Sequence, residues 1–296
     1  MEKLRSMEKT YQTLTFDNKV INLPGGEISL SVLSQEDTVI PSHSGSIVRG
    51  AFLNLISTID YSLADKLHNG NNVRPYSVES IKKISGEYIK NRRNDLIVKK
   101  GELLKLKLKV LDSDILRALI EHFMQSSLPK IDLVGKEYVI SDLVYNIKRV
   151  ELKKRAFKLK VNFLSPTYFS MISREDSMYF PEPKYLFMNL AKLWNLYNKE
   201  VFIPEKQFYE WLDKNARIND YSTRTKRVYI GKSTPIKGFQ GWAVYRFLEE
   251  ENFLPWIHVL AKFGELSNVG GSRTAGFGVM RAKWLDINEN DEQKKK

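Results

Sequence analysis

Alternation of apolar and polar positions predicts strands along the chain. Between residues 27 and 33, Ile28, Leu30 and Val32 share one face, as in a half-buried strand. Residues 104–110 alternate strictly, so one face is apolar and the other carries Lys105, Lys107 and Lys109. These lysines fit either an RNA-binding sheet face or a solvated, protected edge strand.

Helical spacing of apolar residues predicts two helices in the first half of the chain. One covers residues 47–56, with Ser46 as its N-cap, and the other begins at Asp112 or Ser113 and continues through Met124. Extended segments fill residues 79–111 and 138–150. The first half therefore has the order β-α-β-β-α-β, which is that of a ferredoxin-like unit.

The second half repeats this order of elements without a clear repeat of residues. Strands are predicted at 157–163, 228–230, 242–247 and 279–285, with a turn at Lys237-Gly238, and helices at 184–196, 204–214 and 249–263. The predicted fold class is α+β, with two tandem ferredoxin-like domains and a glycine-rich loop near the C-terminus. The expected divisions are an extension at 1–25, domains at 26–152 and 153–286, and a charged tail at 287–296.

Composition removes several kinds of chemistry. The 296 residues include no cysteine, which excludes disulfides, thiolate nucleophiles and Cys-ligated zinc. The four histidines, His43, His68, His122 and His258, lack the spacing of a metal site, so we expect neither metal nor cofactor. No apolar run has the ~18 residues of a membrane span, and the start lacks a secretory signal, so we expect a cytoplasmic protein without membrane association.

A formal net charge of +12 favours a polyanionic partner, nucleic acid first. A lysine-rich surface that only keeps the protein soluble would give the same total. One basic run contains Arg217, Arg224, Lys226 and Arg227, followed by Lys232 and Lys237. Tyr221 and Tyr229 are interleaved, which is typical of surfaces that hold RNA by phosphate contacts and base stacking. The alternative is a solvated hairpin.

A glycine-rich segment lies between the last predicted helix and strand. Four glycines in residues 270–278 allow unusual backbone angles and close approach to a ligand. Their N–H groups could bind phosphate oxygens, helped by the side chain of Arg273. The loop residues that we predict to bind RNA are Gly270, Gly271, Ser272, Arg273, Gly276 and Gly278; those outside the loop are Arg224, Lys226, Arg227, Lys105 and Lys107.

The spacing of this loop resembles the C-terminal signature of the repeat-associated mysterious protein (RAMP) superfamily. That signature is Gly, apolar, Gly, five residues, then Gly, apolar, Gly. Gly270, Gly276, Phe277 and Gly278 fit it, and Asn268 replaces the first glycine. Asparagine tolerates positive φ better than most residues, so the replacement is mild.

Three more segments resemble the CRISPR-associated endoribonucleases that process repeat transcripts. They are residues 63–68 followed by 74–77, then residues 163–167 and residues 237–242, in the order found in that family. The resemblance covers roughly residues 26–285. It implies metal-independent cleavage, in which a ribose 2′-hydroxyl attacks the adjacent phosphate and leaves a 2′,3′-cyclic phosphate. It also implies CRISPR repeat RNA as the partner, with an effector complex and a second copy of the chain as further candidates.

The resemblance assigns catalysis to His68, because a histidine can serve as general acid or base near neutral pH. Arg74 stands near the position of the family's lysine, whereas Leu53 stands where the family has a tyrosine. Arg49 and His43 are further candidates for the same cleft, and Tyr61 and Tyr76 could replace the missing hydroxyl. His122 and His258, in apolar surroundings, are interpreted as structural.

Two other functions remain open. A non-catalytic RAMP subunit that coats guide RNA would share the fold and the loop without needing His68. A basic scaffold that binds other proteins would use its lysines for solubility alone. RNA affinity separates the scaffold from the other two hypotheses, and cleavage separates the nuclease from the subunit.

Overall fold

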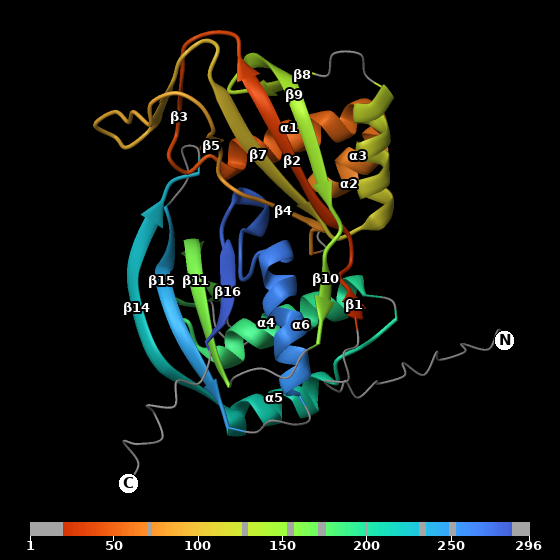
Figure 1. Ribbon diagram of the computed structural model, residues 1–296, viewed down its shortest axis with the longest axis vertical. Helices are drawn as coiled ribbons and strands as arrows, with labels where there is room; N and C mark the ends of the chain where they lie inside the picture. The colour runs from red at the N-terminus through yellow and green to blue at the C-terminus, as the bar shows by residue number, and fades with distance from the viewer. Residues whose placement is uncertain are drawn as a thin grey trace, which may run out of the picture.

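The computed structural model describes residues 20–69, 73–125, 130–152, 157–170, 176–198, 200–230, 235–248 and 253–285. Two mixed units of strands and helices are stacked along the long axis of the molecule (Figure 1). The predicted mixture of helices and strands is confirmed. The charged tail and Lys232 lie outside the described residues.

The first unit is built on an antiparallel sheet. Its strand order is β4 (Tyr76–Val78), β7 (Leu103–Val110), β2 (Gly26–Ser34), β9 (Lys136–Asn146) and β8 (Lys130–Leu133), and β5 (Lys82–Lys83) also pairs with β7. Alternate residues of β2 and β7 are buried, as their sequence pattern predicts. They pack against helices α1 (Gly45–Ile59), α2 (Tyr61–Asn69) and α3 (Ser113–Gln125), which lie on one side of the sheet (Figure 1).

The second unit has a four-stranded antiparallel sheet. Its order is β14 (Ala216–Val228), β15 (Ile236–Phe247), β11 (Lys158–Thr167) and β16 (Met280–Leu285). Helices α4 (Pro183–Tyr197), α5 (Glu205–Asn215) and α6 (Leu254–Ser267) accompany it, and α6 leads into the glycine-rich loop. The short helix η1 (Arg273–Ala275) lies within that loop. Large aromatic side chains, including Trp194 and Trp256, fill the core of this unit.

Three short strand pairs complete the structure. They are β3 (Thr38–Ile40) with β6 (Leu96–Val98), β12 (Phe169–Ser170) with β13 (Ser177–Met178), and β1 (Val20–Asn22) with β10 (Arg149–Glu151). Ile21 and Leu23, near the start of the described chain, are buried in the core of the second unit. The first described strand therefore contributes to the unit that the later half of the chain forms.

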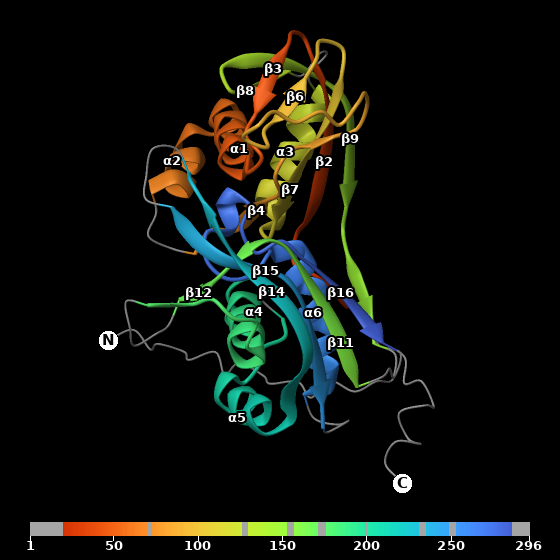
Figure 2. The same cartoon turned by 90° about the vertical axis from the view of Figure 1, so that its left-hand side faces the viewer.

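The β14–β15 hairpin differs from its prediction. β14 is 13 residues long, where the sequence predicted a strand only at 228–230. The predicted turn at Lys237-Gly238 is wrong, because both residues pair with β14 inside β15. Most residues of β14 are exposed, so the strand lacks the apolar alternation that would have revealed it. Its distal end rises toward the first unit (Figures 1 and 2).

The start of α1 also differs by a short distance. The helix begins at Gly45 after Ser44, whereas the sequence predicted Ser46 as its N-cap. The hydroxyl of Ser44 does not cap the helix but accepts a hydrogen bond of 2.8 Å from the Ile81 N–H. A Cβ on Gly45 would lie 2.1 Å from the Ala275 carbonyl oxygen, so glycine here permits α1 to approach the glycine-rich loop.

Candidate active site

The glycine-rich loop lies at the junction of the two units, beneath α1 and α2 in Figure 2. Gly270, Gly276 and Gly278 have φ angles of 76°, 84° and 68°. A Cβ on Gly278 would lie 1.7 Å from the Val269 carbonyl oxygen, so a larger residue could not keep this path. Asn268 has a φ of 56°, which confirms that asparagine occupies a position of positive φ.

The N–H groups of the four loop glycines bond within the protein. Gly270 donates to Asn189 Oδ1, Gly271 to the Tyr168 carbonyl, Gly276 to the Arg273 carbonyl and Gly278 to the Pro166 carbonyl. The expectation that these groups face a phosphate is therefore wrong for this conformation. They stabilise the loop itself, and Ser272 supports it through a 2.8 Å contact between its hydroxyl and that of Tyr168.

Arg273 also differs from the sequence-based expectation. Its side chain is only 7% exposed, and its guanidinium donates to the carbonyls of Ser267 (2.9 Å) and Arg74 (2.8 Å). Burial lowers its pKa to about 10. In this conformation Arg273 does not offer its charge to a phosphate. It connects the loop to the segment that precedes β4.

Arg74 contacts the backbone of His68. His68 is exposed near the end of α2, and the Arg74 guanidinium donates a 2.7 Å hydrogen bond to the His68 carbonyl. The Arg74 carbonyl in turn accepts the bond from Arg273. One continuous set of contacts therefore joins the candidate histidine to the glycine-rich loop.

His43 contacts the loop at Ala275 and Phe277. Its Nε2 lies 2.9 Å from the Ala275 carbonyl oxygen, and its ring meets Phe277 edge-on at 4.7 Å between centroids. Burial lowers the pKa of this imidazole, and the charge of Lys226 lowers it further. A neutral His43 that donates a hydrogen bond to the Ala275 carbonyl is better suited to positioning the loop than to serving as a charged general acid.

Tyr76 lies among three guanidinium groups but is deeply buried. Its side chain is 2% exposed and its ring centroid lies 4.7 Å from that of Phe52. Arg74, Arg49 and Arg273 are within electrostatic reach of its hydroxyl, although burial raises its pKa. Arg49 and Arg74 thus both act electrostatically on Tyr76.

The other positions considered for a hydroxyl behave differently. Leu53 packs against the apolar core of the first unit, so nothing polar projects from that position. Tyr61 is 77% exposed at the start of α2.

Much of the basic run lies on the exposed strand β14, where Arg224 and Lys226 share one face and Arg227 lies on the other. Arg224, Lys226 and Arg227 are all exposed, and Lys226 acts electrostatically on His43. The hairpin packs against the loop through Val228, which forms a small cluster with Ala275 and Phe277. A surface that carries several cations is therefore fixed beside the candidate site.

The three lysines of β7 have three different environments. Lys105 is exposed, whereas Lys107 forms a 2.8 Å ion pair with Glu27. The expectation that all three lie on an exposed face is wrong for Lys109, which is fully buried. Sequence alternation alone could not reveal this, because the second unit covers that end of the strand.

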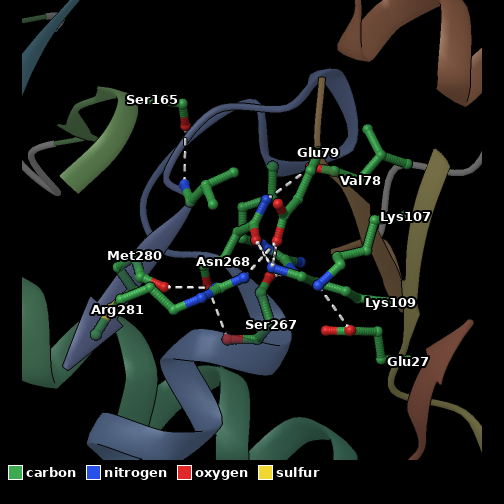
Figure 3. Close-up of polar contacts among 12 residues, drawn as sticks. Glu27, Val78, Glu79, Lys107, Lys109, Ser165, Ser267, Asn268, Met280 and Arg281 are labelled. Atoms are coloured by element: carbon green, nitrogen blue, oxygen red, sulfur yellow. Dashed lines mark hydrogen bonds and ion pairs between the residues drawn. The ribbon is translucent and has the colours of Figure 1, made fainter. Parts of the chain in front are cut away.

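Lys109 belongs to a buried polar network between the units (Figure 3). Its Nζ lies 2.9 Å from Glu79 Oε1 and donates a 2.8 Å hydrogen bond to Asn268 Oδ1. Arg281 of β16 also pairs with Glu79, at 3.0 Å. Burial raises the pKa of Glu79, but the charges of Lys109 and Arg281 outweigh burial and hold it well below its usual range. No local sequence pattern indicates this network, because its members are far apart along the chain.

Asn268 also bonds to two backbone carbonyls beside this network. Its Nδ2 donates to the carbonyls of Val78 (2.9 Å) and Phe277 (3.1 Å). The amide thus joins the loop to β4, a connection that a glycine could not make.

The described part of the chain contains no group of three His, Asp or Glu residues arranged to hold a metal ion. None of its helices is both long enough and apolar enough to cross a membrane.

Comparison with known proteins identifies the fold. Residues 161–280 match the family model of the CRISPR-associated endoribonuclease Cas6. The resemblance to the repeat-processing endoribonucleases is confirmed. A Cas6 product complex superposes with a TM-score of 0.66 at 19% identity, covering 88% of this chain and 99% of the other.

Other relatives agree with this result. Cas6 from Thermus thermophilus gives a TM-score of 0.62 at 18% identity, covering 89% of this chain and 99% of its own. The Cas6 endoribonuclease of Mycobacterium tuberculosis is 25% identical over 129 residues, which is 43% of this chain. That alignment spans 40% of the length of the mycobacterial protein. The structural likeness concerns the fold as a whole, whereas the sequence likeness concerns part of it.

Proposed function

We propose that this protein is a metal-independent endoribonuclease that cuts CRISPR repeat transcripts into guide RNAs. The observation that carries the proposal is the set of contacts from His68 through Arg74 to the glycine-rich loop. These contacts connect His68, a candidate acid–base group, with the cation Arg74 and with Arg273 of the glycine-rich loop. The similarity to Cas6 proteins supports the same activity.

The chemistry requires alignment more than a strong nucleophile. The ribose 2′-oxygen forms a bond to phosphorus, the bond to the 5′-oxygen breaks, and a 2′,3′-cyclic phosphate remains. The 2′-hydroxyl loses a proton and the 5′-oxygen gains one, so a group such as His68 can serve at either step. Arg74 and Arg49 would stabilise the charge on the phosphate, because a guanidinium stays protonated and binds phosphate oxygens through paired N–H groups.

We also propose that both units are ferredoxin-like, divided near residues 152 and 153. In each sheet the strands that come first and third in a β-α-β-β-α-β order are neighbours. These are β2 and β7 in one unit and β11 and β15 in the other. The exposed face of β14 would hold RNA beside the loop.

A cleavage assay in excess EDTA tests the proposal. Labelled repeat RNA should be cut at one position with a 2′,3′-cyclic end, and His68→Ala should slow the reaction by ~10²- to 10⁴-fold. His122→Ala, which removes an imidazole from α3, is the matched control and should cut at the normal rate. Cutting that requires added metal would contradict the proposal. Undiminished cleavage by His68→Ala would move the site toward His43 and Arg49.

One observation favours a second function. Leu53, where the resemblance implies a tyrosine, packs into the core. A subunit that coats guide RNA without cutting it would not need the missing hydroxyl. Tight binding of repeat RNA without cleavage, under conditions where the protein is folded, would favour this alternative. A CRISPR effector complex and a homodimer remain predicted partners of either form.

A further inference from the structure

A cavity of about 450 Å³ adjoins the glycine-rich loop at Gly270 and Gly271. Its walls come from α4, α5, β12 and the start of the loop, and include Tyr185, Asn189, Lys192, Tyr209, Phe169 and Gly270. The volume lies within the ~300–1,000 Å³ typical of small-molecule and cofactor sites. The cavity lining includes none of His43, Arg49, His68 and Arg74.

One wall of the cavity is aromatic. Tyr185 stacks on Phe169 with a centroid distance of 6.4 Å and an interplanar angle of 23°. Phe169 is buried, so it holds the half-buried Tyr185 ring in a fixed orientation. Tyr209 is exposed, and Lys184 lies 5.7 Å from its ring centroid. Aromatic side chains supply the flat surface on which a nucleobase stacks.

A fixed amide supplies hydrogen-bonding specificity. Asn189 Oδ1 accepts a 2.8 Å hydrogen bond from the Gly270 N–H, which orients the amide. The Nδ2 group, for which the described residues provide no acceptor, remains available to a base edge. The Gly270 N–H therefore fixes the amide so that its Nδ2 group, and not its oxygen, faces a ligand.

The charge of the cavity suits an anion. The lining that the described residues form includes Lys184 and Lys192 but no carboxylate. Lys184 is engaged with Asp213 at 2.5 Å, whereas Lys192 is exposed. A larger cavity of about 820 Å³ elsewhere between the units is lined by Asp112, Asp114 and other carboxylates, which would repel phosphate.

We propose that the 450 Å³ cavity binds one unpaired nucleotide of the same RNA that the candidate active site cuts. The base would stack on the tyrosine wall and accept a hydrogen bond from Asn189, and its phosphate would contact Lys192. This inference rests on the RNA-processing function proposed above. The two sites share the glycine-rich loop, since Gly270 lines the cavity whereas Ala275 contacts His43. The bound nucleotide therefore flanks the cut site.

The decisive experiment measures RNA affinity and its salt dependence in matched variants. Asn189→Asp keeps the acceptor for Gly270 but replaces the NH₂ group by a charged oxygen, and should weaken repeat-RNA binding by roughly tenfold. Lys192→Gln should reduce the slope of log K against log salt by about one. Lys206→Gln is the control, because Lys206 is exposed on α5 and does not line the cavity; its affinity and slope should match the wild type.

Cross-linking locates the nucleotide. Repeat RNA carrying a single 4-thiouridine, scanned along its sequence, should give one position that cross-links to the peptides containing Tyr185 or Tyr209. If the wild-type protein binds and cuts repeat RNA while both cavity variants bind it equally well, the cavity inference is overturned and the nuclease proposal stands. If the wild-type protein binds no RNA, both fall.

A free nucleotide is the other source of the same chemistry. Repeat RNA should displace a fluorescent mononucleotide from the wild-type cavity if the two share the site. Binding of the mononucleotide that is lost in Asn189→Asp but unaffected by saturating repeat RNA would overturn the proposal in favour of a separate nucleotide site.

Discussion

The Nζ of Lys109 donates a 2.8 Å hydrogen bond to Oδ1 of Asn268, and both side chains are completely buried. Lys109 lies on β7 of the first unit, and Asn268 begins the glycine-rich loop of the second. The position where the loop departs from the RAMP signature is therefore also a position where the two units are joined. Asparagine in place of the signature's first glycine therefore provides a side chain that bonds to the first unit.

Removal of Lys109 should destabilise the whole chain. In Lys109→Met the Glu79 carboxylate stays buried and keeps only the more exposed cations Arg281 and Lys82, which should cost ~3–5 kcal/mol of unfolding free energy. Urea unfolding measures this loss. The double variant Lys109→Met with Glu79→Gln also removes the buried negative charge and should be more stable than the single variant.

An exposed ion pair provides the comparison. Lys99 and Asp37 are 2.7 Å apart, with both side chains about 60% exposed. Lys99→Met should change the unfolding free energy by less than ~1 kcal/mol. An equal loss for Lys99→Met and Lys109→Met would contradict the view that burial makes the Lys109 network important.

Acid should weaken the same network. The folded-state pKa of Glu79 is well below its usual range, so the unfolded chain takes up a proton first as the pH falls. The contribution of Glu79 is complete above pH ~4.5 and decreases below it. Unfolding free energies measured between pH 7 and pH 3 should fall more steeply for the wild type than for Glu79→Gln. Parallel curves would show that Glu79 titrates normally.

Two glycines of α1 should respond in opposite directions to alanine. A Cβ on Gly45 would clash with the Ala275 carbonyl, so Gly45→Ala should destabilise the protein by ~1–3 kcal/mol and slow cleavage by displacing the loop. Gly50 is exposed on the same helix, and a Cβ added there would meet no atom within 4 Å, so Gly50→Ala should stabilise by ~0.5–1 kcal/mol. Thermal unfolding and the cleavage assay together test the pair.

Arg273 should act through Arg74 rather than on RNA directly. Arg273→Met removes the hydrogen bonds to the carbonyls of Ser267 and Arg74, so cleavage should fall by more than RNA affinity does. Single-turnover rates at saturating protein, measured beside equilibrium binding, separate the two effects. A reduced salt slope in Arg273→Met would instead indicate a direct phosphate contact.

The exposed cations of β14 should act on RNA affinity. Arg224→Ala combined with Lys226→Ala should weaken binding to all RNA sequences alike and lower the salt slope by about two. Lys107→Ala is a useful comparison, because Lys107 is already paired with Glu27; its slope should change less. Unchanged binding by the β14 variant would place the RNA elsewhere.

Local patterns predicted much of the fold but little of the contact between the units. β2 and β7 bury alternate residues, so periodicity located them. β14 is polar along most of its length, and periodicity missed it. The resemblance assigned His68 and Arg74 to one candidate site, and that assignment stays a prediction. The sequence could not show that Arg273 or Lys109 is buried. Both depend on contacts between residues more than a hundred positions apart.

The pairing of β1 with β10 has a consequence for how the chain is made. Ile21 and Leu23 complete a core whose other members belong almost entirely to the second half of the sequence. As the polypeptide leaves the ribosome, β1 can pair with β10 once that strand has emerged, but Ile21 and Leu23 cannot be buried until the later unit has also emerged. A C-terminal half produced alone would lack the side chains of Ile21 and Leu23 in its core. A short peptide that contains these two residues, added to that half, should fill the gap and stabilise it.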